Sequence, residues 1–65
     1  MQPQEERIGT LVVDNSPLAL RAICSFLEDL PGVRIVGTTT DGLEALALAA
    51  KLQPDLALLD MHMPA

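Results

Sequence analysis

Two aspartates follow the apolar runs of this 65-residue chain, Asp14 after residues 8–13 and Asp60 after Leu56–Leu59. The second run is continuously apolar, which is typical of a strand covered on both faces in a parallel sheet. Such sheets bind ligands just beyond the carboxyl ends of their strands. Taken alone, Asp60 is explained equally well as a polar residue that ends a strand. Two carboxylates at neighbouring strand ends repel one another, so the pair favours a bound cation or one protonated acid.

The chemistry that suits such a pair is phosphoryl transfer with Mg²⁺. This ion takes one or two carboxylates and leaves positions open for phosphate oxygens. A carboxylate beside it can attack a phosphoryl group and form an acyl phosphate. The turn at residues 14–17 has no glycine-rich pattern, which excludes the dinucleotide fingerprint and the nucleotide-binding phosphate loop.

A serine or cysteine nucleophile is disfavoured, because His62 is the only histidine that could serve as its base. One histidine beside two hard-oxygen acids does not make a transition-metal site. We therefore expect the backbone carbonyl of His62, and not its side chain, to contribute to the metal site.

The first apolar run is typical of a strand that turns into a helix. Ile8–Val13 is rich in β-branched residues, and Ser16 and Pro17 suit the N-cap and the first helical position. We expect the helix to reach about Leu30. Its apolar residues repeat at three and four positions and define one buried face, which comprises Ala19, Leu20, Ala22, Ile23, Phe26, Leu27 and Leu30.

A more polar run, Val33–Thr39, is expected to form an edge strand, because it contains an arginine, a glycine and threonines. Asp41 and Glu44 have the spacing of a capping box, in which the glutamate reaches back to the cap residue. The helix that they begin should end near Gln53. Its predicted buried residues are Leu43, Leu46, Ala47 and Ala50.

The element order is strand, helix, strand, helix, strand, with connections too long for hairpins. This order predicts an α/β fold, a flavodoxin-like parallel sheet with flanking helices. The two apolar strands belong inside and the mixed strand at the edge, which gives the spatial order 2-1-3. Asp14 and Asp60 then end beside each other at the topological switch point.

Composition excludes several functional classes. The formal charge of −5, with only four Lys and Arg residues, leaves no basic patch for nucleic acid. Residues 1–7 are polar and read as a flexible tail without a signal peptide or membrane span, so a cytoplasmic location is expected. The single Cys24 is expected to be a small buried hydrophobic residue.

Three motifs in order resemble the response-regulator receiver domain: residues 12–17, 41–45 and 58–64. The resemblance covers residues 8–65 and implies a signalling domain, not an enzyme, that takes a phosphoryl group from a sensor histidine kinase onto Asp60. It implies that Asp14, Asn15, Asp60 and the carbonyl of His62 hold Mg²⁺. An output domain or partner protein would then read the phosphorylated state.

Two departures from the family pattern matter. Asn15 stands where the family usually has a second acid, so we expect weaker Mg²⁺ binding and slower phosphorylation. The chain ends at Ala65, about halfway through the family fold, and Lys51 does not match the family's later lysine. We therefore expect an amino-terminal half receiver whose third strand is a bare edge, completed by self-association into a homo-oligomer.

Two alternatives stay open. The first is an interaction or dimerisation module that has only the receiver fold, without phosphate transfer. The second is a Mg²⁺-dependent phosphohydrolase of another α/β family. That class needs a second acid two residues after the first, where this chain has Ser16, so it is the weaker alternative.

Overall fold

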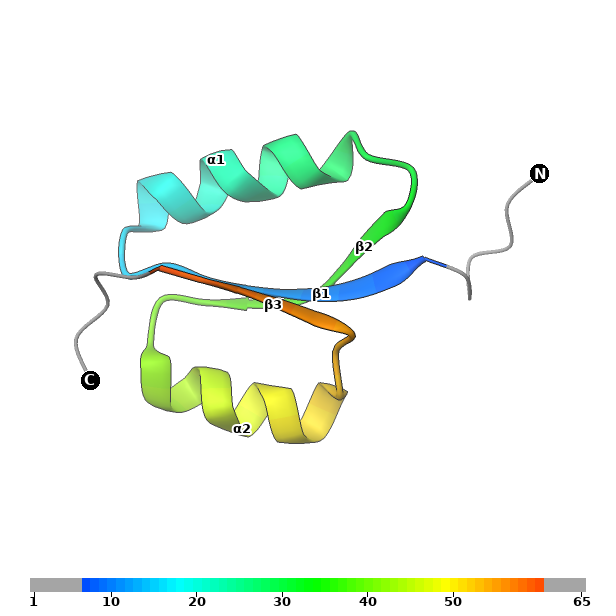
Figure 1. Ribbon diagram of the computed structural model, residues 1–65. Coiled ribbons are helices and arrows are strands. Elements are labelled where there is room, and N and C mark those ends of the chain that lie inside the picture. Colours follow the sequence, from blue (N-terminus) through cyan, green and yellow to red (C-terminus); the bar gives the residue numbers. More distant parts are fainter. Residues whose placement is uncertain (1–6, 61–65) are drawn as a thin grey trace.

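The computed structural model describes residues 7–60. Residues 1–6 of the predicted tail lie outside this range, and so does His62. The elements follow the predicted order: β1 (Ile8–Val13), α1 (Pro17–Glu28), β2 (Val33–Thr39), α2 (Gly42–Leu52) and β3 (Leu56–Leu59). The strands are parallel and ordered β2-β1-β3, and α1 and α2 lie on opposite faces of the sheet (Figure 1). The predicted sheet and its strand order are confirmed.

The start of α1 follows from its local sequence. The Ser16 side chain accepts a hydrogen bond from the Ala19 N–H at 3.2 Å, and proline occupies the first turn. Both features satisfy or remove backbone donors that have no partner within the helix. The helix ends at Glu28, before the expected Leu30.

The buried face of α1 is narrower than predicted. Leu27 is buried, and Leu20 and Ile23 are half-buried, whereas Phe26 is 65% exposed. Ala22 and Leu30 are exposed as well, so the prediction was wrong for these three residues. Among the described residues the sheet has three strands, and α1 contacts β1 and β2 but not β3, so part of its apolar surface has no partner there.

The start of α2 differs from the predicted capping box. Asp41 is the N-cap, and its Oδ1 accepts a hydrogen bond from the Leu43 N–H at 3.0 Å. Glu44, however, does not reach back to Asp41. Its carboxylate accepts the Thr39 hydroxyl, while Thr39 Oγ1 accepts the Asp41 N–H at 3.0 Å. Thr39 thus takes the part that the sequence assigned to Glu44 and joins the end of β2 to α2.

The predicted inner face of α2 was wrong. Ala45 is buried, and Leu48 and Ala49 pack against the same cluster, whereas Leu43 and Leu46 are 76% and 70% exposed. Ala47 and Ala50, also predicted to be buried, are exposed. The sequence 43–50 is apolar on nearly every side, so helical periodicity alone does not select the buried face.

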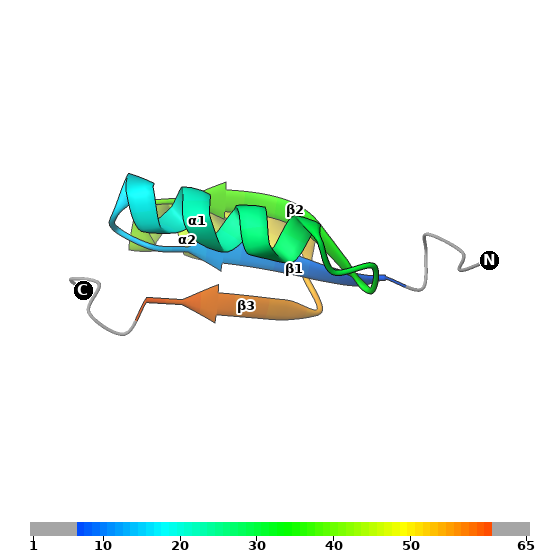
Figure 2. The same cartoon turned by 90° about the horizontal axis from the view of Figure 1, so that it is seen from above.

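The core is centred on β1, where Leu11, Val12 and Val13 are at most 1% exposed. By contrast, Leu56 and Leu59 of β3 are 44% and 62% exposed. Figure 2 shows the reason: α1 and α2 lie over β1 and β2, while β3 runs along an open edge of the sheet. The expectation that Leu56–Leu59 is covered on both faces was therefore wrong for the described chain, and the expectation of a bare edge strand is confirmed.

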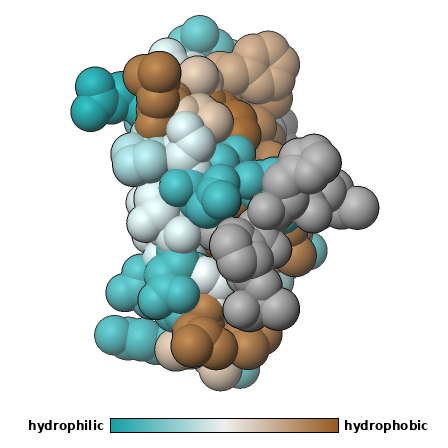
Figure 3. Space-filling model, turned by 90° about the vertical axis from the view of Figure 1, so that its left-hand side faces the viewer, coloured by the Kyte–Doolittle hydropathy of each residue, from teal (hydrophilic) through white to brown (hydrophobic). Residues whose placement is uncertain are grey.

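Further apolar side chains are exposed at the amino ends of the helices. Seen from the carboxyl ends of the strands, hydrophobic surface gathers over α1 and over α2, with hydrophilic surface between them (Figure 3). The most exposed of these side chains is Leu18, at 77%. Within residues 7–60, neither helix has the length and apolar character needed to cross a bilayer.

Candidate functional site

Backbone pairing brings the two predicted acids to one edge of the sheet. The Asp14 N–H donates to the Thr39 carbonyl at 3.2 Å, which continues the β1–β2 ladder. The Asp60 N–H donates to the Val13 carbonyl at 3.0 Å, which continues the β1–β3 ladder. Asp14 and Asp60 therefore follow neighbouring strands at the switch point, as the sequence predicted.

The Asp14 side chain is held in place by its own turn. Its Oδ1 accepts the Ser16 N–H at 2.9 Å, and the residue is only 9% exposed. The other carboxylate oxygen accepts no hydrogen bond from residues 7–60. A buried carboxylate with one oxygen still available suits a cation ligand, because burial of an unpaired charge is costly.

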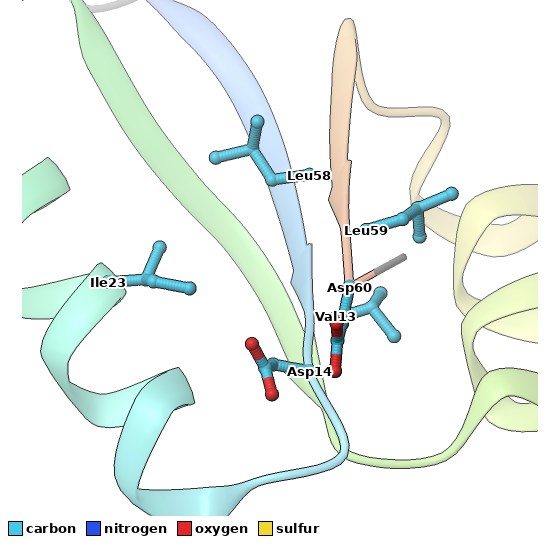
Figure 4. A pocket seen from close by; sticks show the side chains of 6 residues that line it. All are labelled: Val13, Asp14, Ile23, Leu58, Leu59 and Asp60. Carbon is cyan, nitrogen blue, oxygen red and sulfur yellow. The ribbon is translucent and has the colours of Figure 1, made fainter. Parts of the chain in front are cut away.

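The two acids line the same open pocket, of about 290 Å³, whose other lining residues are apolar: Val13, Ile23, Leu58 and Leu59. Figure 4 shows both carboxylates at the ends of β1 and β3, with Ile23 of α1 across the pocket from Leu58. Sequence reasoning missed Ile23 at the pocket and Thr39 beside Asp14, since it assigned the first to the core and the second to an edge strand. No sequence signal distinguishes either residue from an ordinary packing residue.

The side-chain donors at the pocket are few. Among residues 7–60, no group of three or more His, Cys, Asp or Glu side chains could hold a metal ion. The two carboxylates, with the exposed amide of Asn15 directly after Asp14, offer only hard oxygen donors. Mg²⁺ prefers such donors and keeps several waters. The predicted carbonyl ligand of His62 lies outside the described residues and stays a prediction.

Two other reactive side chains lie apart from the pocket. Cys24 on α1 is half-buried, and burial, with a smaller contribution from the Glu28 carboxylate, raises the pKa of its thiol. The thiol is therefore protonated at neutral pH and is a poor nucleophile. Lys51 is in the last turn of α2, at the end of the molecule opposite the carboxyl ends of the strands (Figure 1).

The fold and the acid pair define a class: an α/β module with an oxygen-donor site at the switch point of a parallel sheet. Residues 10–65 match the family described as the response regulator receiver domain. The chain therefore belongs to this receiver family of two-component signalling.

Individual relatives agree with this membership. The chain is 40% identical over 57 residues to a protein-glutamate methylesterase/protein-glutamine glutaminase of Methanospirillum hungatei, covering 88% of this chain and 16% of the relative. It is 41% identical over 61 residues to the probable C4-dicarboxylate response regulator DctR of Halalkalibacterium halodurans, covering 94% of this chain and 26% of that protein.

Among solved structures, the signal receiver domain of NarL from Mycobacterium tuberculosis superposes with a TM-score of 0.86 at 37% identity. The match covers 92% of this chain and 48% of the NarL chain. The chain thus spans about half the length of the receiver structure that it matches and a smaller share of the curated relatives.

Proposed function

We propose that the chain is a phosphoacceptor module that takes a phosphoryl group from a sensor histidine kinase onto Asp60. The observation that supports this proposal best is the shared pocket of Asp14 and Asp60, in a chain that belongs to the receiver family. The output domain or partner protein that would read the phosphorylated state belongs to the same proposal.

In the proposed reaction, a carboxylate oxygen of Asp60 attacks the phosphorus of the donor. A new P–O bond forms as the bond to the donor's leaving group breaks, and the product is an acyl phosphate on Asp60. Asp14, Asn15, Asp60 and the His62 carbonyl would hold Mg²⁺. The ion, when bound, would neutralise negative charge on the phosphoryl oxygens.

The side chains of the pocket have distinct parts in this proposal. Asp14 is oriented by the Ser16 N–H, so that its second oxygen is available to a cation. Ile23 and Leu58 form apolar walls beside the acids, from which a bound phosphoryl donor could displace water. A drier site strengthens the electrostatic interactions on which phosphoryl transfer depends.

The test is incubation with acetyl phosphate and Mg²⁺, followed by mass spectrometry. We expect one phosphoryl group on the wild-type chain and on an Asp29→Asn control, which removes an exposed acid at the end of α1. We expect none on Asp60→Asn and slower labelling of Asp14→Asn. Equal labelling of Asp60→Asn and wild type would refute Asp60 as the phosphoacceptor.

A second candidate function, self-association, is supported by the exposed apolar edge of β3. An edge strand presents unpaired backbone groups that another strand can pair with, and Leu56 and Leu59 offer apolar surface beside them. We infer that two copies associate through this edge. Sedimentation at micromolar concentration should detect a dimer that Leu59→Lys disrupts and Leu18→Lys, on α1, does not. A monomeric wild-type chain would contradict this inference.

A further inference from the structure

Asp55, in the turn that leads into β3, makes two hydrogen bonds to a single residue of β1. Its N–H donates to the Gly9 carbonyl at 2.7 Å, and its Oδ2 accepts the Gly9 N–H at 2.8 Å. These bonds lie at the start of the β1–β3 ladder, whereas the Asp60–Val13 bond lies at its end (Figure 2).

The side chains of β3 do not specify its register. All four residues, Leu56–Leu59, are apolar, and three of them, Leu56, Ala57 and Leu59, are exposed. A strand with a polar and an apolar face resists a one-residue shift, because the shift would exchange the two faces. In β3 that shift replaces one apolar residue with another, so the hydrophobic pattern opposes it only weakly.

The two hydrogen bonds of Asp55 favour one register of β3 over its one-residue shifts. Were β3 shifted so that Pro54 faced Gly9, neither bond could form, because proline has no N–H and no side-chain acceptor. Were Leu56 to face Gly9, the Asp55 side chain would no longer lie opposite Gly9, and its hydrogen bond to the Gly9 N–H would be lost.

The space around Gly9 is adapted to this contact. A Cβ atom built on Gly9 would lie 3.3 Å from Asp55 Oδ2 and 3.3 Å from Val36 Cγ1. A larger side chain would therefore press against the carboxylate, and glycine leaves room for it.

The register of β3 determines where Asp60 lies. In the observed register Val13 pairs with Leu59, which places Asp60 next to Asp14. A shift by one residue would move Asp60 by about 3.3 Å along the strand and turn its side chain to the other face. We propose that Asp55 is a positioning residue that fixes the register of β3 and so places Asp60 in the pocket. Its consequence for phosphoryl chemistry rests on the proposed function.

The test compares Asp55→Ala with Asp55→Asn in the 65-residue chain. Asparagine keeps an oxygen that can accept the Gly9 N–H, so Asp55→Asn should retain the native register. Leu27→Ala is the stability control, because it removes a buried side chain of α1 without touching the β1–β3 ladder. Three readouts are needed: cross-strand nuclear Overhauser contacts between β1 and β3, hydrogen exchange of the Asp60 amide, and Mg²⁺ affinity by titration.

We expect Asp55→Ala to lose the contact between Val13 and Leu59, to lose exchange protection of the Asp60 amide, and to bind Mg²⁺ about tenfold more weakly. Asp55→Asn should retain the Val13–Leu59 contact, the protection of the Asp60 amide and the Mg²⁺ affinity. The folded molecules of the stability control, Leu27→Ala, should retain them as well. Native cross-strand contacts in Asp55→Ala would overturn the proposal. If the wild type binds no Mg²⁺, the proposed function fails, while the cross-strand contacts still decide whether Asp55 sets the register.

Discussion

β1 and β3 are neighbouring apolar strands that each lead into an aspartate of the pocket, yet their surroundings differ. Leu11, Val12 and Val13 of β1 are at most 1% exposed, whereas Leu59 of β3 is 62% exposed. β1 has a strand on either side and a helix over each face, while β3 pairs with β1 alone among the described residues.

This difference separates two ways of positioning an acid. Asp14 follows a strand held by packing on all sides, and the Ser16 N–H then fixes its side chain. Asp60 follows a strand held mainly by backbone hydrogen bonds, together with the polar contact of Asp55 at its far end. The end of β1 is thus rigid through its core, whereas the end of β3 depends on register.

The largest expected effect is on stability and compares the two strands directly. Leu11→Ala should lower the free energy of unfolding by about 2–5 kcal/mol, because it leaves a cavity in the core. Leu59→Ala should change it by about 0.5 kcal/mol or less, because its side chain is mainly in solvent. Urea unfolding followed by circular dichroism measures both values. Equal losses would mean that β3 is covered in solution, which would favour the dimer.

The next prediction concerns charge at the end of β1. Asn15→Asp places a third carboxylate beside the pocket and should tighten Mg²⁺ binding about tenfold, because one more negative charge then attracts the ion. Ser25→Asp, which adds the same charge on the exposed face of α1, should leave the affinity unchanged. Mg²⁺ titration of both variants measures these affinities. An affinity unchanged by Asn15→Asp would show that the missing carboxylate at residue 15 does not weaken Mg²⁺ binding.

The smallest expected effect tests packing at Gly37, which pairs with Leu11 across the β1–β2 ladder. A Cβ atom there would lie 2.7 Å from Leu52 Cδ1, so Gly37→Ala should cost about 1 kcal/mol as Leu52 shifts. Gly32 has open space around it and no positive φ, so Gly32→Ala should stabilise by about 0.5 kcal/mol. The midpoint temperature of thermal unfolding should fall for Gly37→Ala and rise for Gly32→Ala. Similar shifts would show that α2 packs less closely than described.

Features that depend on adjacent residues were predictable from the sequence. Ser16 and Asp41 cap the helices, as their residue types indicate. The parallel sheet follows from the alternation of strands and helices, and the order β2-β1-β3 was inferred from the more polar composition of β2. The convergence of Asp14 and Asp60 follows in turn from parallel pairing and the strand order.

Features that depend on distant neighbours were not predictable. The face of α2 that is buried was wrongly predicted, because Leu43 and Leu46 are as apolar as the residues that pack inward. The cover of β3 was wrongly predicted from its apolar run, since burial depends on what packs against a strand. The pairing of Asp55 with Gly9 joins residues 46 positions apart, and only the structure shows it.

We propose that the ends of β1 and β3 form one phosphoryl site. Titration with beryllofluoride and Mg²⁺, followed by nuclear magnetic resonance, tests it most directly. We expect Mg²⁺-dependent shifts of the Asp14 and Asp60 amides together, and we expect both shifts to be lost in Asp60→Asn and in Asp14→Asn. Shifts that persist in Asp60→Asn, or that affect one strand end alone, would contradict it.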